Sequence, residues 1–396
     1  MINLDDYLKR DRLFEKDNDS DGPMLEELVS ELIENTSIYF IRSNLANHLV
    51  VKDGIKNIIV WDTFYWELFE KHVALVQLAR TSEKNDEMAS ICQLMLSNFS
   101  FYLARKYERN NDLSIALLID AIRYGYEEFN CFDFAPVEID ITICKLFTLF
   151  HEMAHINFSQ DKKTKTVYYN YVRKNIFQND YKELFLLASE FFPIDESFVQ
   201  TCVEDLLNGK NPVLLEELAA DHFALFHTFN FISTLKIIEP SALAILFKDA
   251  LMALIDFNDS MNVLKSEWDY YNAAISLKVT NREFFSDRIQ RNRLATNQTN
   301  LFRDNFSHAL MLYELSILGQ FDDESANAFF DDLYRDDDTE LFDRYFSIAL
   351  RNSLWDDDYI TDRVLFANVK SQSNTPSYAE KLALKKRLLK KFFKAF

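Results

Sequence analysis

Glycine and proline are scarce in this chain: together they supply 11 of its 396 residues. A sheet-rich protein spends more of both residues on its turns, so the scarcity argues against a fold built mainly from short strands. Hydrophobic residues make up 48% of the chain, which is too many for an intrinsically disordered protein. The composition therefore predicts a globular, mainly helical protein.

Basic charge is also in short supply, with 43 Lys and Arg against 63 Asp and Glu and a net charge of −20. A surface of that sign repels phosphate, which argues against a nucleic-acid partner. The sequence has no run of about 18 uninterrupted apolar residues, so we expect no membrane span. The four cysteines form no CxxC pair, and the first residues lack the apolar segment of a signal peptide. We therefore expect reduced thiols and a cytoplasmic protein.

Helical spacing dominates the sequence, and strand signals are confined to a short region. Residues 1–35 have the pattern of helices, with a break and a new start at Asp21-Gly22-Pro23. Short β-branched or aromatic runs follow from residue 37, and Asp53-Gly54 between two of them predicts a hairpin. The aromatic segment from residue 61 returns to helical spacing. We expect a mainly α protein with a small β-sheet, which is an α+β class.

The composition changes after about residue 320. An acidic stretch covers residues 322–358, and a basic amphipathic segment closes the chain. The sequence thus predicts a main domain over 1–300 and an α-helical C-terminal region over 301–396. The basic tail fits a docked terminal helix best, with a membrane surface or a partner protein as alternatives. We expect the region to gate access to the main domain or to recognise a regulatory partner or trigger.

The segment DITICKLFTLFHEMAHINF contains the motif with the clearest chemistry. Its apolar residues recur three or four apart, and Asp140 is placed to cap the helix. His151 and His155 are four residues apart, so on a helix both imidazoles project from one face and can bind a single metal ion. Glu152 follows the first histidine, where a carboxylate can act as general base on a metal-bound water. The pattern HExxH predicts a Zn²⁺ site.

A catalytic zinc usually takes a third protein ligand. The metzincin continuation would need histidine at position 161, which is Asp161 here, in a lysine-rich segment that we expect to be a loop. The helix that Pro212 opens carries Glu217 instead, 62 residues after His155. Asp221, one turn later, can accept the second N–H of a ligand histidine. Glu216 is the competing ligand, although it has no aspartate four residues after it.

HExxH followed by a later helix with ExxAD resembles the glutamate-type zincins, or gluzincins. Within that group the chain most resembles the peptidase family of the phage-exclusion protein Lit. The similar segments are NHLVVKDGIKNIIV, WDTFYWELFEKHVAL, the HEMAH helix and EELAADHFALF, and they extend over about residues 40–290. The resemblance implies a zincin-like core with His151, His155 and Glu217 as metal ligands, Glu152 as catalytic base and Asp221 behind a ligand histidine.

Members of that family are intracellular zinc peptidases of phage defence that cut a host translation factor, elongation factor Tu. The resemblance thus implies a zinc metallopeptidase with a protein substrate, and it suggests a translation factor as the candidate. NREFFSDRI is similar to a segment that ends in Arg-Ile near the site, which would give Arg288 a substrate or oxyanion role. Thr280-Asn281 stand where relatives often have His-Pro.

Several residues near the motif have a plainer alternative. His222 and His227 could stabilise an oxyanion or bind substrate, but satisfied structural histidines are commoner at such positions. Cys144 shares a helix face with His151 and is expected to be a core thiol. One alternative for the whole chain is a non-catalytic helical interaction protein in which the zinc site is structural or vestigial. A third class, which HExxH with ExxxD disfavours, is zinc-assisted hydrolysis of a non-peptide substrate.

Overall fold

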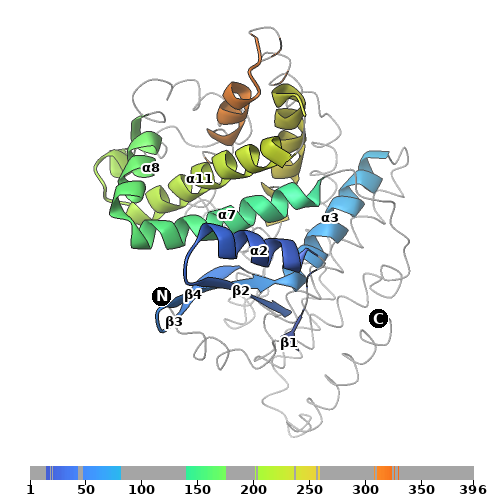
Figure 1. Ribbon diagram of the computed structural model, residues 1–396. Helices are drawn as coiled ribbons and strands as arrows, with labels where there is room; N and C mark the ends of the chain where they lie inside the picture. Colours follow the sequence, from blue (N-terminus) through green and yellow to red (C-terminus); the bar gives the residue numbers. More distant parts are fainter. Residues whose placement is uncertain are drawn as a thin grey trace, which may run out of the picture. The chain divides into compact units, whose positions relative to one another are not determined.

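The computed structural model describes the following residues: 15–17, 19, 21–42, 48–81, 140–174, 201, 204–235, 238–255, 257–258, 307, 310–322, 325 and 329 (Figure 1). Most of them are helical, and a small sheet accompanies the helices. The expected class, mainly α with a small β-sheet, is therefore confirmed for this part of the chain. None of the described helices is long and apolar enough to cross a membrane.

The sheet has four short strands near the start of the chain. In sequence order they are β1 (Glu15–Lys16), β2 (Thr36–Arg42), β3 (Leu49–Asp53) and β4 (Lys56–Asp62). Across the sheet the order is β1-β2-β4-β3, with β2 parallel to β4 and the other pairs antiparallel. β3 and β4 form the predicted hairpin. Its turn contains Gly54 at φ +61°, in the left-handed region that glycine enters without a steric cost.

The N-terminal segment corrects the prediction of helix over residues 1–35. Glu15 and Lys16 are a strand that pairs with Arg42 and Ile41 at the edge of β2. The backbone of β2 supplies hydrogen-bond partners for this strand, and the spacing of residues within the N-terminal segment carries no information about such partners. The helix α2 (Gly22–Leu32) does begin at the predicted break, with proline in its first turn.

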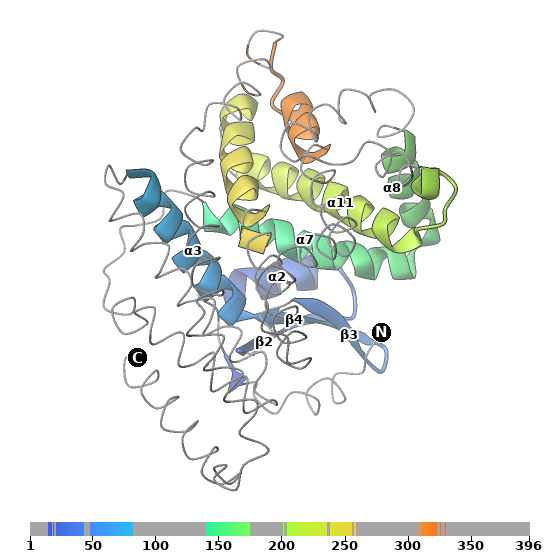
Figure 2. The ribbon, with the colours of Figure 1, turned by 180° about the vertical axis from the view of Figure 1, so that it is seen from behind.

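Three helices pack against one another beyond the sheet: α7 (Ile141–Gln160), α8 (Lys162–Lys174) and α11 (Pro212–Leu235). In both views α7 and α11 lie side by side, and α8 lies near one end of the pair (Figures 1 and 2). The Asp140 carboxylate accepts the N–H of Thr142 at 3.1 Å, so the predicted cap of α7 is confirmed. The apolar residues that recur three or four apart on this helix include Ile143, Phe147, Phe150 and Ala154, and all four are buried.

The helix α8 corrects the prediction of a loop at the lysine-rich segment. Asp161 ends α7 and caps α8: its backbone N–H donates to the Asn157 carbonyl, and its carboxylate accepts the N–H groups of Lys163 and Thr164. The side-chain cap stabilises the first turn of a helix that has few apolar residues to bury. The aspartate in the metzincin ligand position therefore serves as a helix cap.

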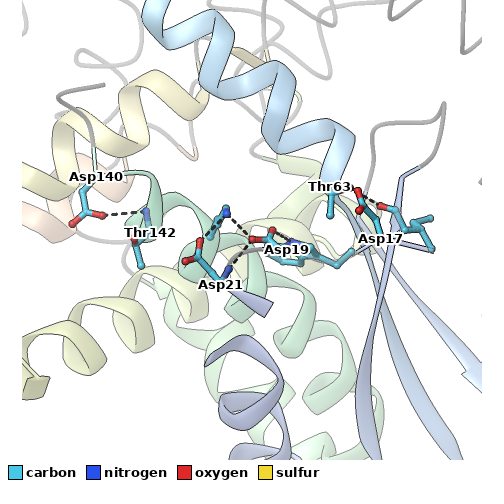
Figure 3. A network of polar contacts seen from close by, with 9 residues as sticks. Asp17, Asp19, Asp21, Thr63, Asp140 and Thr142 are labelled. Atoms are coloured by element: carbon cyan, nitrogen blue, oxygen red, sulfur yellow. Dashed lines mark hydrogen bonds and ion pairs between the residues drawn. The ribbon is translucent and has the colours of Figure 1, made fainter. Parts of the chain in front are cut away.

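A buried ion pair ties α7 to the N-terminal segment (Figure 3). The Lys145 ammonium lies 2.9 Å from Oδ1 of Asp19 and 2.7 Å from Oδ2 of Asp21. Trp61 in β4 donates its indole N–H to the other oxygen of Asp19 at 3.1 Å. Burial raises the pKa of Asp19, but the bonds to Lys145, the Asp21 backbone and Trp61 outweigh it and hold the pKa below its usual value. The network fixes the helix that carries HEMAH against β4.

His48, immediately before β3, is a second buried polar group of this region. Its Nδ1 accepts the backbone N–H of Asp62 at 3.2 Å. Its ring packs against those of Trp61, Tyr65 and Trp66, at centroid distances of 4.5, 4.8 and 5.5 Å. Burial lowers the pKa of His48 to about 3, so the imidazole is neutral at pH 7.

The helix α3 (Thr63–Thr81) follows β4 directly, as the aromatic segment predicts. By its contacts the chain divides into two compact units, 1–66 with 138–256 and 294–333, and 67–137 with 257–293 and 334–396. The sheet, α2, α7, α8 and α11 all belong to the first unit. The predicted boundary at residue 300 and the helical C-terminal region stay predictions, because the chain beyond 329 lies outside the described residues.

Candidate metal centre

The two histidines of HEMAH meet one glutamate of α11. His151 and His155 lie one turn apart on α7, and Glu217 faces them from α11. One ligand atom from each of the three residues lies within 4.8 Å of the other two. All three side chains are half-buried, with exposed fractions of 13, 22 and 25%. The structure thus brings together the three ligands predicted from sequence in a cluster that could hold a metal ion.

The separations within the cluster suit a small tetrahedral ion. Nε2 of His151 lies 3.2 Å from Nε2 of His155 and 3.5 Å from a carboxylate oxygen of Glu217. Nε2 of His155 lies 3.8 Å from the other oxygen of Glu217. A tetrahedral ion with bonds of about 2.0–2.2 Å, as for zinc, separates its ligand atoms by about 3.3–3.6 Å. Two imidazoles and a carboxylate are also a donor set that zinc accepts.

Asp221, one turn after Glu217, lies behind the first histidine. Its Oδ1 is 2.8 Å from Nδ1 of His151. Burial lowers the pKa of His151, but the bond to Asp221 and its charge, together with Glu217 and Glu152, outweigh burial and raise the pKa to about 10. Because Nδ1 is bonded to this carboxylate, Nε2 is the nitrogen that faces the cluster, and a metal ion bound there would displace the second proton that the raised pKa places on the ring.

Glu216, the competing ligand, is turned away from the three-residue cluster. Its Oε1 lies 3.5 Å from Nδ1 of His155, on the far side of that ring from the nitrogen that faces Glu217. Its other oxygen accepts hydrogen bonds from Lys165 and Tyr169 of α8, each at 2.8 Å. Burial raises the pKa of Glu216, but the bonds from Lys165 and Tyr169 outweigh it and hold the pKa below its usual value. The geometry therefore favours Glu217 over Glu216 as ligand.

Sequence reasoning missed Lys165 because its segment was expected to be a loop, and it gave Tyr169, in the helix expected after that loop, no role at the site. Two features of the sequence could have found them: Asp161 stands before a polar run, and Lys165 and Tyr169 in that run are four residues apart. An aspartate before a polar run is a helix cap, and side chains four apart on a helix share a face. Read that way, α8 offers both groups to one carboxylate.

Glu152 lies on α7 directly after His151, the first candidate ligand, and is partly exposed. Its charge is one of those that raise the pKa of His151. Arg288, the candidate substrate or oxyanion residue, lies outside the described residues.

His222 and His227 lie on α11 but serve its packing. Nδ1 of His222 is 2.6 Å from a carboxylate oxygen of Glu314, and its ring stacks on Tyr171 with centroids 4.0 Å apart. Nε2 of His227 is 3.1 Å from the Tyr168 hydroxyl. Neither residue belongs to the three-residue metal cluster. The geometry therefore supports the plainer alternative for both histidines, which is that they are structural residues with satisfied hydrogen bonds.

Cys144 is buried in the core, as expected, and its Sγ donates to the Ala250 carbonyl at 3.2 Å. Burial raises the pKa of its thiol, which makes a reactive thiolate unfavourable.

Comparison with protein families, with curated proteins and with solved structures finds no match to this chain. The functional argument therefore rests on the geometry of the chain's own residues.

Proposed function

We propose that this protein is a zinc metallopeptidase of the glutamate zincin type, with a zincin-like core and an intracellular protein substrate. The observation that carries the proposal is the convergence of His151, His155 and Glu217 with a glutamate directly beside the first histidine. Three protein ligands are the usual number in a catalytic zinc site, whereas structural zinc sites usually have four.

The ligand residues and their partners have distinct roles in the proposed reaction. Zinc held by the three ligands would lower the pKa of a coordinated water to about 7 and polarise the substrate carbonyl. Glu152 accepts the proton of the attacking water and then delivers it to the leaving amine. Asp221 holds the proton of His151 on Nδ1, which keeps Nε2 available as a ligand nitrogen.

The proposal extends to the biological role that the resemblance implies. We propose that the chain is a relative of the Lit peptidase family, acting in phage defence with a translation factor as candidate substrate. The features that support this are HEMAH, the helix with ExxxD and the hairpin before them. The C-terminal region is proposed to gate the site or to receive the trigger.

Glu152→Gln tests the chemistry separately from the metal. The change keeps the size of the side chain but removes the base, so we expect zinc content to stay at the wild-type level while proteolysis falls by a factor of about 10³ or more. Glu26→Gln, an exposed position on α2, is the matched control and should leave both unchanged.

A comparison of protein termini in cells can identify the substrate. New protein N-termini would be compared by mass spectrometry between cells that express wild type and cells that express Glu152→Gln. The proposal expects one or a few termini that appear with wild type alone. Wild-type cleavage by the Gln variant would refute the role of Glu152. A zinc-loaded wild type that yields no new terminus, with or without phage infection, would favour the non-catalytic interaction protein.

A further inference from the structure

A buried serine from a distant segment binds the carboxylate that orients His151. The Ser307 hydroxyl donates to Oδ2 of Asp221 at 2.6 Å. The other oxygen of the same carboxylate lies 2.8 Å from Nδ1 of His151. Ser307 and Asp221 have exposed fractions of only 6 and 7%. A chain of short polar contacts therefore runs from residue 307 through Asp221 to the candidate ligand.

The two contacts to Asp221 restrain the carboxylate from both sides. With a single partner, a carboxylate can still rotate about its Cβ–Cγ bond, and the angle of its bond to the imidazole changes with that rotation. With Ser307 on one oxygen and His151 on the other, rotation breaks a buried hydrogen bond, which costs more than an exposed one. The orientation of the His151 ring is thereby fixed from outside α7 and α11.

The segment that carries Ser307 has a second and independent attachment to α11. Glu314, seven residues later, lies 2.6 Å from Nδ1 of His222, the neighbour of Asp221. Leu310, Met311, Leu312 and Leu315 are buried on the same segment. The 310–318 helix, coloured orange in Figures 1 and 2, lies near α11 in both views. Loss of the Ser307 hydroxyl alone should therefore leave the segment docked.

We propose that Ser307 is a positioning residue of the metal centre, acting through Asp221 on the His151 imidazole. The inference rests on the proposed metal site and deepens it. In this proposal the segment that begins at residue 307 helps to orient the candidate ligands, although it supplies no ligand of the described cluster. Metal affinity would then depend on how this segment packs on α11.

Metal affinity and ligand geometry provide the test. Co²⁺ and Zn²⁺ affinities would be measured by competition with a chromophoric chelator, and the visible spectrum of the Co²⁺ form reports the coordination geometry. We expect Ser307→Ala to lower the affinity about tenfold, the lower end of the range for residues that support ligands, and to shift the Co²⁺ spectrum. Ser307→Thr keeps the hydroxyl and should restore both. Ser316→Ala is the matched control, because that hydroxyl donates to the Tyr313 carbonyl within its own helix.

A double-mutant comparison separates positioning from a general structural effect. If Ser307 acts through Asp221, Ser307→Ala should lower affinity about tenfold in the wild-type background but less than about twofold in the Asp221→Ala background. An equal loss in both backgrounds would overturn the proposal, as would wild-type affinity and an unchanged Co²⁺ spectrum in Ser307→Ala. If Ser307→Ala does not fold, Ser307→Cys keeps the volume with a weaker donor and should show the same direction of change. A folded wild type that binds no metal would instead refute the metal site, and this proposal with it.

Discussion

Acidification should destabilise the protein through His48, and the size of the effect follows from its surroundings. The imidazole is neutral in the folded state, with a pKa of about 3, because it is buried among three aromatic rings and accepts the Asp62 N–H. In the unfolded chain the pKa returns to about 6.5. Below pH 6.5 the unfolded state therefore binds a proton that the folded state does not, and stability falls as the pH falls towards 3. The loss from this one group is about 2 kcal/mol at pH 5 and about 4 kcal/mol at pH 3, and it levels off at about 5 kcal/mol below pH 3.

Urea unfolding at pH 7 and pH 5, followed by tryptophan fluorescence, measures this loss in wild type and in His48→Asn. The asparagine oxygen can still accept the Asp62 N–H, but the side chain no longer titrates. The variant should be less stable at pH 7, because a buried ring is lost, yet it should lose about 2 kcal/mol less than wild type between pH 7 and pH 5. His72, whose pKa burial lowers to about 4, titrates in both proteins and cancels in the difference. An equal loss of stability in the two proteins would refute the reasoning.

Three further predictions concern the ion pair and the metal site. Lys145→Met should lower the free energy of unfolding by about 3–5 kcal/mol in urea titrations, because it leaves Asp19 buried without its ammonium partner; a loss below about 1 kcal/mol would contradict that. Asp221→Asn should weaken zinc binding about 10- to 100-fold in a chelator competition, because the charged partner of His151 is lost, and unchanged affinity would argue against the orienting role. Zinc at a free concentration of about 100 times its Kd should stabilise the wild type by about 2.7 kcal/mol, seen as a higher melting temperature that EDTA reverses; the same shift in His155→Ala would place the metal elsewhere.

The features that could be predicted from sequence are those with a local cause. Four-residue spacing on one helix places His151 and His155 on a common face whatever surrounds them. The same rule places Asp221 one turn from Glu217. The Asp53-Gly54 hairpin likewise follows from the conformational freedom of glycine at a two-residue turn.

The features that could not be predicted depend on contacts between distant segments. The contacts that separate Glu217 from Glu216 depend on how α11 faces α7 and α8, whereas the sequence favoured Glu217 only through the aspartate four residues after it. Ser307 lies 86 residues from Asp221, and a single serine has no motif that would mark it. The strand at Glu15–Lys16 exists because the edge of β2 pairs with it. Each of these needs the tertiary arrangement before its role can be recognised.

Elemental analysis of the purified protein tests the central claim most directly. Wild type would be reloaded with zinc, freed of excess metal and analysed beside His151→Ala, Glu217→Ala and Glu216→Ala, with circular dichroism to establish that each is folded. The three-ligand site predicts about one zinc per chain in wild type, most of it retained in Glu216→Ala and lost in the other two variants. A folded wild type without zinc, or a full zinc equivalent retained in Glu217→Ala, would contradict it.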